Sequence, residues 1–233
     1  MTRRVARLAL GTLIGLIFVA LGIWQLERRS WKLALIAQVE QRLAAPPVAP
    51  PGPEAWPRID TDDPYTRVVA QGRYRPNSDT YVLASTALGA GYWVLTPLDT
   101  GSFDLLINRG FVPVELRGKV PTPQGAVKVE GLLRLTEPGG GFLRSNAPAA
   151  DRWYSRDVAA IAATRRVDRA APYFVDASGP DHGWPRGGLT IVRFRNNHLS
   201  YALTWFGLAA GLVVMVVVAR RWGKEPRQGP NDA

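Results

Sequence analysis

Two long apolar runs, one near each end of the chain, are the strongest pattern in the sequence. They cover residues 8–26 and 199–219, and neither contains a charged residue. At about 1.5 Å of rise per helical residue, each run matches the roughly 30 Å hydrocarbon core of a bilayer. The pattern therefore predicts two transmembrane helices.

The residues that flank these runs predict how the chain is oriented in the membrane. The tails 1–7 and 220–233 are rich in arginine and lysine, and basic residues beside a span favour the cytoplasmic side. We therefore expect both termini to be cytoplasmic and the central residues to lie on the opposite side. The first run is longer than the apolar core of a signal peptide, so we expect it to remain as an anchor.

Two segments with different residue patterns separate the first span from the β-like part of the chain. Over 27–43, apolar residues recur at helical spacing, which predicts an amphipathic extension of the first helix. The proline-rich stretch 44–57 then predicts a stiff linker rather than an element of the core.

Residues 58–198 carry short β-type runs separated by glycine and proline turn signals. Ser155 is expected to cap one short helix, with Val158, Ile161 and Ala162 on its apolar face. The predicted fold class is a membrane α+β protein in which two transmembrane helices flank one β-rich extracytoplasmic domain, either an antiparallel sheet or a barrel-like one. Strands are expected at 67–70, 80–84, 92–98, 103–108, 127–135, 173–176 and 189–194.

The formal charge of +10 and the absence of cysteine narrow the range of functions. Basic residues are not gathered into one patch, so they favour attraction to the lipid bilayer and argue against nucleic-acid binding. Without cysteine the chain has no disulfide, no thiolate metal site and no covalent haem attachment through CxxCH.

Recognisable catalytic motifs are missing from the sequence, and we expect a protein that is not an enzyme. The glycines at 139–141 are interpreted as a turn, because no Lys-Ser/Thr pair follows them. His182, beside Asp181, is interpreted as a solvated loop histidine. A serine hydrolase built on that pair stays open as a hypothesis, because catalytic triads assemble from distant positions.

His198, one of only two histidines, stands where the second apolar run begins. Tyr201 and Trp205 follow it at i+3 and i+7, so the three side chains form a stripe along one side of a helix. An imidazole in this position is a candidate ligand for haem iron, and Arg193 or Arg195 would then hold the propionates. The alternative is that these residues only anchor the helix at the membrane interface.

The spacing of glycines predicts where the two spans approach each other. Gly11 and Gly15 in the first span have GxxxG spacing, as do Gly207 and Gly211 in the second. Close packing at these glycines, toward the cytoplasm, would leave a cleft at the outer ends of the helices, where Trp24 lies. A flat ring such as haem would fit a cleft of this kind.

Four segments, taken in order, give the sequence a family resemblance. They are LGIWQLERRSWKLALI at 21–36, GYWVLTPLDT at 91–100, LLINRGFVP at 105–113 and NNHLSYALTWFGLA at 196–209. Together they resemble the Surfeit locus protein 1 family, which are assembly factors for cytochrome c oxidase.

The resemblance implies a multi-pass protein of the bacterial inner membrane with its central domain in the periplasm. It would bind haem a, with His198 as the iron ligand, and aid insertion of haem a into subunit I of the oxidase. Haem a synthase is a further candidate partner. The alternative is a haem-independent scaffold that stabilises an oxidase assembly intermediate.

The resemblance also singles out residues of the β-rich domain and of the first span that match the family pattern. Gly91 and Gly110 are expected to suit turns, and Arg109 is left open between an internal ion pair and a functional role. The residues that match the family pattern are Trp24, Gln25, Gly91, Tyr92, Asn108, Arg109 and Gly110.

Overall fold

The computed structural model describes residues 2–60, 63–179, 183–190, 194 and 196–222. Its contacts divide the chain into two compact units. One unit joins residues from the two ends of the sequence, Met1–Gln38 and Arg193–Ala233, and the other is Val39–Val192.

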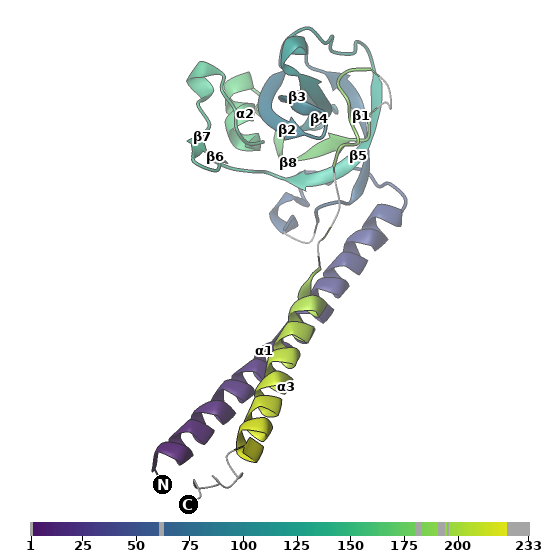
Figure 1. The fold of residues 1–233 in the computed structure, drawn as a ribbon. Coiled ribbons are helices and arrows are strands. Elements are labelled where there is room, and N and C mark those ends of the chain that lie inside the picture. Colours follow the sequence, from purple (N-terminus) through teal and green to yellow (C-terminus); the bar gives the residue numbers. More distant parts are fainter. Residues whose placement is uncertain (1, 61–62, 180–182, 191–193, 195, 223–233) are drawn as a thin grey trace, which may run out of the picture. The chain divides into compact units, whose positions relative to one another are not determined.

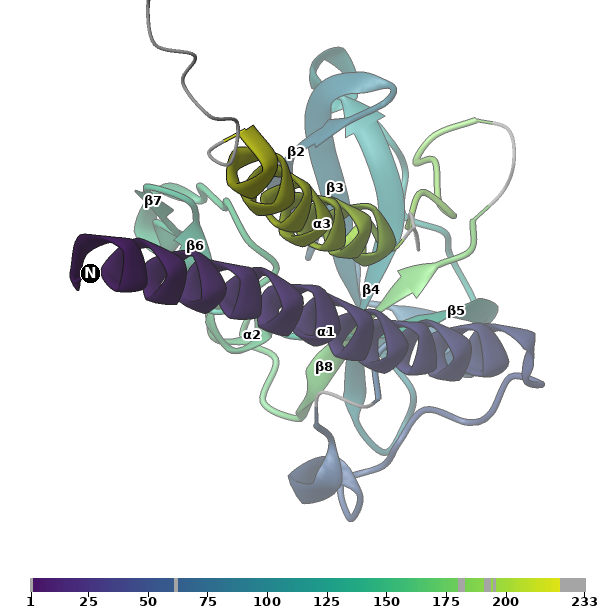
Figure 2. The ribbon, with the colours of Figure 1, turned by 60° about the horizontal axis from the view of Figure 1, so that its bottom comes forward.

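The first unit contains two long helices that lie side by side (Figures 1 and 2). They are α1, Thr2–Ala44, which continues into the second unit, and α3, His198–Trp222. Both are long and apolar enough to cross a membrane, and only 6% and 11% of their most apolar windows are buried. A core helix of a soluble protein would be mostly buried instead, so the prediction of two apolar membrane helices is confirmed.

The second unit is a small barrel with one additional strand (Figure 1). Its sheet has the order β1-β5-β8-β4-β3-β2, and β1 also pairs with β3, which closes the first five of these strands into a ring. All pairs are antiparallel except β4 with β8. The strands are β1 Arg67–Tyr74, β2 Thr80–Thr86, β3 Gly89–Asp99, β4 Asp104–Pro113, β5 Val127–Leu135 and β8 Ala170–Ala177. The barrel-like form of the prediction is therefore confirmed.

Alternation along the strands divides the apolar side chains between two cores. In β4, Leu105 and Ile107 belong to the interior of the barrel, whereas Leu106 belongs to a second cluster. This second cluster contains Trp153 and residues of helix α2, Val158–Arg165. A strand that is buried on both faces carries apolar residues at successive positions, which explains the continuous apolar run at the start of β4.

The N-cap of the short helix lies two residues after the predicted one, Ser155. Asp157 is the N-cap, and its carboxylate accepts a hydrogen bond from the Ala160 amide at 3.1 Å. Ser155 instead donates its hydroxyl to the Glu137 carbonyl. The predicted cap was wrong because a carboxylate also satisfies the first free amides of a helix. The predicted apolar face, Val158, Ile161 and Ala162, is buried.

Two further predictions about the barrel unit need correction. The described residues of the run 189–194, which are Leu189, Thr190 and Phe194, form no strand. Because the ring is closed, β8 is already paired on both sides. The proline-rich stretch was predicted as a stiff linker outside the core, but Val48 forms a β-bridge with Val68 and Trp56 packs against the barrel core.

The remaining described elements are short and lie in the connections between the longer helices and strands. They are the 3-10 helices Trp56–Arg58, Val114–Leu116 and Pro148–Ala150, and the hairpin of β6, Gly140–Gly141, with β7, Arg144–Ser145. Gly140 and Gly141 form the first strand of this hairpin, whose turn is at Phe142 and Leu143, so the interpretation of residues 139–141 as the turn itself was wrong.

Candidate functional site

His198 is the first residue of α3, and its side chain is paired with a polar residue of α1. The Nδ1 atom of His198 lies 2.7 Å from Oε1 of Gln25. In the tautomer that donates from Nδ1 to this amide oxygen, the lone pair of Nε2 is left for a ligand. His198 is half-buried.

The contact between the helices continues along α3 from His198. Ala202 is 1% exposed, and Trp205 packs on Phe18 with 5.7 Å between ring centroids. Gly22 of α1 faces Phe206 so closely that an added Cβ would lie 2.5 Å from the ring. The helices are therefore in close contact just beyond the Gln25–His198 pair.

The predicted aromatic stripe is divided between two surfaces. Trp205 belongs to the contact between α1 and α3, whereas Tyr201 is 56% exposed and Trp24 is 52% exposed. The contact follows His198, Ala202 and Trp205, which are spaced i, i+4 and i+7. Tyr201 lies beside this row and presents its ring outward, as a bilayer-facing aromatic residue would.

The predicted cleft at the outer ends of the helices is wrong. Gly207 and Gly211 have open space where a Cβ would be added and are exposed, so they do not form a helix contact. The close approach is at Gly22, and a groove between the helices lies farther along, from Leu8 to Val19 on α1. The GxxxG pattern placed the contact too close to the termini because spacing alone does not show which face meets the other helix.

Four of the residues considered from the sequence lie outside the part of the chain that the structure describes. These are the candidate propionate ligands Arg193 and Arg195, and the loop pair Asp181 and His182. Their roles stay predictions.

Arg109, which the sequence left open, forms an internal network. Its guanidinium is 6% exposed, donates to the Pro121 carbonyl at 2.6 Å and to Thr122 at 3.3 Å, and pairs with Asp79 at 3.5 Å. The Arg109 charge also opposes the effect of burial on Tyr74, but burial dominates and raises the pKa of Tyr74 to about 12. Arg109 therefore holds the loop between β4 and β5 against the barrel.

The two family glycines lie within strands rather than in turns. A Cβ on Gly91, in β3, would lie 2.1 Å from the Val112 carbonyl oxygen. Gly110, in β4, has a φ of +130° and faces the backbone of Arg186 at 2.3 Å. Both positions need glycine because another segment of backbone passes close by.

A buried ionic cluster around Asp176 was missed from the sequence. Its carboxylate accepts hydrogen bonds from Asn108 at 2.7 Å, Thr190 at 2.9 Å, Arg134 at 3.1 Å and Arg156 at 3.3 Å. Asp176 ends a β-type apolar run, so the sequence showed a polar residue directly after the apolar Val175. Its partners come from four separate segments, which sequence spacing does not reveal.

Glu137 extends this cluster through Arg156, whose Nε donates to a Glu137 oxygen at 3.0 Å. Burial raises the pKa of Glu137, but the hydrogen bonds and charge of Arg156 outweigh burial and leave the pKa below its ordinary value. Burial likewise lowers the pKa of Arg156, and the Glu137 and Asp176 carboxylates more than reverse that effect. Both groups are therefore held in their charged forms.

The barrel unit also has a basic cleft, a surface cavity of about 260 Å³. The Arg117 guanidinium lies over the rings of Tyr92 and Tyr81, at 4.9 and 5.7 Å from their centroids. The acid in the cleft, Asp151, is already paired with Arg165. Three arginines line it, Arg117, Arg144 and Arg152, and none has a carboxylate partner among the described residues.

An exposed apolar tip precedes one of these arginines in the sequence. Phe142 is 93% exposed and Leu143 is 88% exposed, at the turn of the β6–β7 hairpin that leads into Arg144. Leu143 has a φ of +59°, a conformation that costs a non-glycine residue energy. Exposed apolar residues beside unpaired cations are typical of a surface that binds another molecule.

These features define a class of protein in which the strands of a small closed β barrel come between two apolar helices in the sequence, and a polar Gln25–His198 pair joins the helices. A model of the SURF1 family matches residues 12–210. The chain belongs to the SURF1 family, as the resemblance of its segments predicted.

Relatives with this family name are similar over most of the chain. Surfeit locus protein 1 of Homo sapiens is 35% identical over 218 residues, covering 82% of this chain and 69% of that protein. The Mus musculus protein of the same name is 34% identical over 216 residues, with coverages of 82% and 68%. A SURF1-like protein of Monosiga brevicollis is 34% identical over 228 residues, with coverages of 87% and 83%.

Proposed function

We propose that this protein is a non-catalytic assembly factor for cytochrome c oxidase that binds haem a at His198 and aids its insertion into subunit I. The observation that carries the proposal is the hydrogen bond between His198 Nδ1 and Gln25. A histidine that ligates a metal commonly donates its other ring N–H to a fixed acceptor, which orients the ring and makes the free nitrogen more basic. Gln25 is the only amide within the apolar run 8–26, so its place beside His198 supports a specific role.

In this proposal a large flat ring would lie against exposed side chains near His198, without the cleft that the sequence predicted. When bound, haem a would supply the redox-active iron that the oxidase needs, and His198 would hold it through Nε2. The exposed rings of Trp24 and Tyr201 offer apolar surface on the two helices that bear the pair. Arg193 and Arg195, just before α3, would neutralise the propionates.

The proposed setting follows from the two helices and the basic tails. Both termini would be in the cytoplasm of a bacterium, and the barrel would be in the periplasm. Subunit I of the oxidase would be the recipient, and haem a synthase is a candidate donor. This setting would put His198 at the periplasmic end of α3, where a ligand in the outer leaflet can reach it.

An absorbance spectrum of the detergent-solubilised protein, purified from a host that makes haem a, tests the ligand assignment. We expect a Soret band that is lost in His198→Ala and kept in Asn197→Ala, the matched control at the neighbouring position. Gln25→Leu should weaken haem binding, and Gln25→Glu, which keeps an oxygen acceptor, should restore part of it. A His198→Ala protein that retains its full haem content would overturn the assignment.

The basic cleft favours a second candidate function, a scaffold that holds an oxidase assembly intermediate without binding haem. Three arginines that have no carboxylate partner among the described residues, together with the exposed Phe142–Leu143 tip, suit a protein partner with an acidic, partly apolar surface. This function predicts no Soret band in the purified protein. It also predicts that Arg117→Glu combined with Arg144→Glu abolishes co-purification with oxidase subunits, whereas Lys128→Glu, an exposed basic site on β5, does not.

A further inference from the structure

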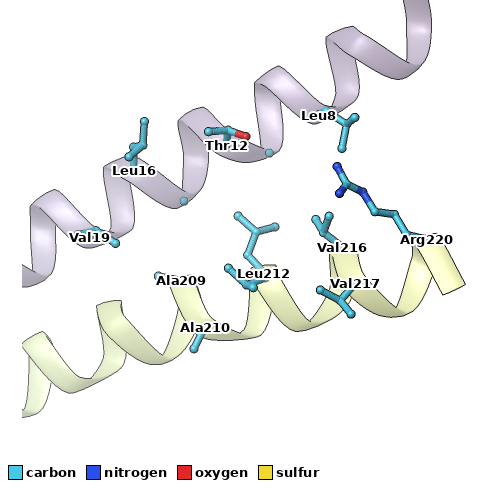
Figure 3. A pocket seen from close by; sticks show the side chains of 13 residues that line it. Leu8, Thr12, Leu16, Val19, Ala209, Ala210, Leu212, Val216, Val217 and Arg220 are labelled. Atoms are coloured by element: carbon cyan, nitrogen blue, oxygen red, sulfur yellow. The ribbon is translucent and has the colours of Figure 1, made fainter. Parts of the chain in front are cut away.

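A groove between the two apolar helices lies at the end of the pair that is distant from His198 (Figure 3). Its volume is about 540 Å³, which is within the range of about 300–1,000 Å³ usual for small-ligand sites. The walls are almost entirely apolar. They consist of Leu8, Gly11, Thr12, Gly15, Leu16 and Val19 of α1 with Ala209, Ala210, Leu212, Val213, Val216, Val217 and Arg220 of α3.

The groove is present because small residues leave space between the helices. A Cβ added to Gly11 would meet no atom within 4 Å, and one added to Gly15 would only touch Leu212 at 3.5 Å. Ala209 and Ala210 keep the facing part of α3 equally small. The helices are thus in tight contact at Gly22, but farther along their own side chains do not fill the space between them.

A single charged side chain lines the groove. Arg220 extends from α3 across one end of it, and its guanidinium points toward Leu8 of α1 (Figure 3). Among the described residues Arg220 has no carboxylate partner. Arg221 is the next residue but does not line the groove. A guanidinium at the end of an apolar span lies at headgroup depth, where its natural partner is a phosphate.

We propose that this groove is a binding site for an anionic phospholipid. One acyl chain fills the apolar groove, and the headgroup phosphate accepts hydrogen bonds from Arg220. A partner helix would need an acidic residue of its own to pair with Arg220. An anionic lipid instead presents an acyl chain at the depth of the groove and a phosphate at the depth of Arg220. The site requires only that the helices span a bilayer, and it is separate from His198 and from the proposed haem binding.

Native mass spectrometry of the full chain in detergent, titrated with phosphatidylglycerol or phosphatidylcholine, tests the site. We expect phosphatidylglycerol to be retained more strongly and to raise the unfolding temperature. Arg220→Gln should weaken its binding by about fivefold to tenfold, because one cation beside a lipid phosphate is removed. Arg221→Gln removes the same charge one residue away and should change binding by less than about twofold.

A second pair of variants tests the apolar half of the site. Gly11→Leu would place a side chain in the groove, whereas Gly207→Leu adds the same side chain to α3 where a Cβ also meets open space but outside the groove. Both changes replace a helical glycine, so both should leave the helices folded. We expect Gly11→Leu to abolish lipid retention and Gly207→Leu to preserve it.

Three results would overturn the proposal. Equal weakening by Arg220→Gln and Arg221→Gln would mean diffuse attraction of lipids to a basic terminus. Equal binding of the two lipids would exclude recognition of the anionic headgroup. A change from dimer to monomer in Gly11→Leu, without loss of lipid, would assign the groove to a second copy of the chain. The Soret band of Arg220→Gln should equal that of the unmodified protein, so failure here and failure of the haem proposal can be told apart.

Discussion

The two units of this protein bury their residues in opposite ways. The barrel has two apolar clusters and buried polar groups that are paired with named partners, such as Asp176 and Arg109. The helix pair buries little beyond Gly22, Ala202 and Ala209 and presents most of its apolar side chains outward. In water the barrel can fold on its own core, but the helices need a lipid environment to cover their surfaces.

This difference in burial indicates where each unit could bind another molecule. The barrel buries paired polar groups such as Asp176 and Arg109, and its exposed candidate binding surfaces are the basic cleft and the Phe142–Leu143 tip. The helix pair has one tight contact, a half-buried histidine at one end and an open groove at the other. The lipid that we propose would fill the groove, whereas the haem that we propose would bind at the exposed end beside His198.

The largest effect should come from breaking the buried ionic cluster of the barrel. Asp176→Ala leaves Arg134 and Arg156 without their shared carboxylate, and removal of one member of a buried ion pair costs about 3–5 kcal/mol. Glu130→Gln is the control, because the Arg67–Glu130 pair is exposed and should contribute less than about 1 kcal/mol. Denaturant unfolding of the full chain measures the free energy of unfolding of both variants. Equal losses would show that the buried cluster stabilises the barrel no more than an exposed ion pair does.

A second prediction applies one substitution to both units. Gly110→Ala strains a backbone with a φ of +130° and pushes a Cβ into the Arg186 backbone, so we expect a loss of about 3 kcal/mol. In Gly22→Ala the obstacle is the Phe206 ring, which can turn aside, and alanine also favours the helix by about 1 kcal/mol. Unfolding midpoints should therefore fall much further for the barrel variant. A larger fall for Gly22→Ala would mean that the helix contact is the more rigid of the two.

The smallest effect concerns acid sensitivity of the barrel. The pKa of Glu137 is lowered from its model-compound value of 4.5, so its contribution to stability is fully present above that value and is lost as the pH falls through the lower, folded-state pKa. The side chain is 39% exposed, which limits the effect. We expect Glu137→Gln to be less stable than the unmodified chain at pH 7 and to differ less from it in acid. A difference that grows as the pH falls would contradict the sign of the shift.

Predictions from local patterns succeeded where a single segment carries the information. The strand at 127–135 was predicted with its observed bounds, and the buried face of α2 was read from Val158, Ile161 and Ala162. The apolar lengths of α1 and α3 identified both helices. Predictions about contacts between segments were less reliable. Gly207 and Gly211 have the spacing of a helix contact but face away from α1, because spacing does not set rotation.

The sequence by itself determined the two apolar spans, the β character of the middle of the chain and the family to which it belongs. These follow from hydrophobic periodicity and from ordered segments, which act within a few neighbouring residues. Only the tertiary structure decided that the strands close into a ring, that Gln25 holds the His198 ring and that Arg109 is an internal group. It also placed the groove at Arg220 rather than beside Trp24. These features depend on which faces of distant segments meet, and packing between segments sets that choice.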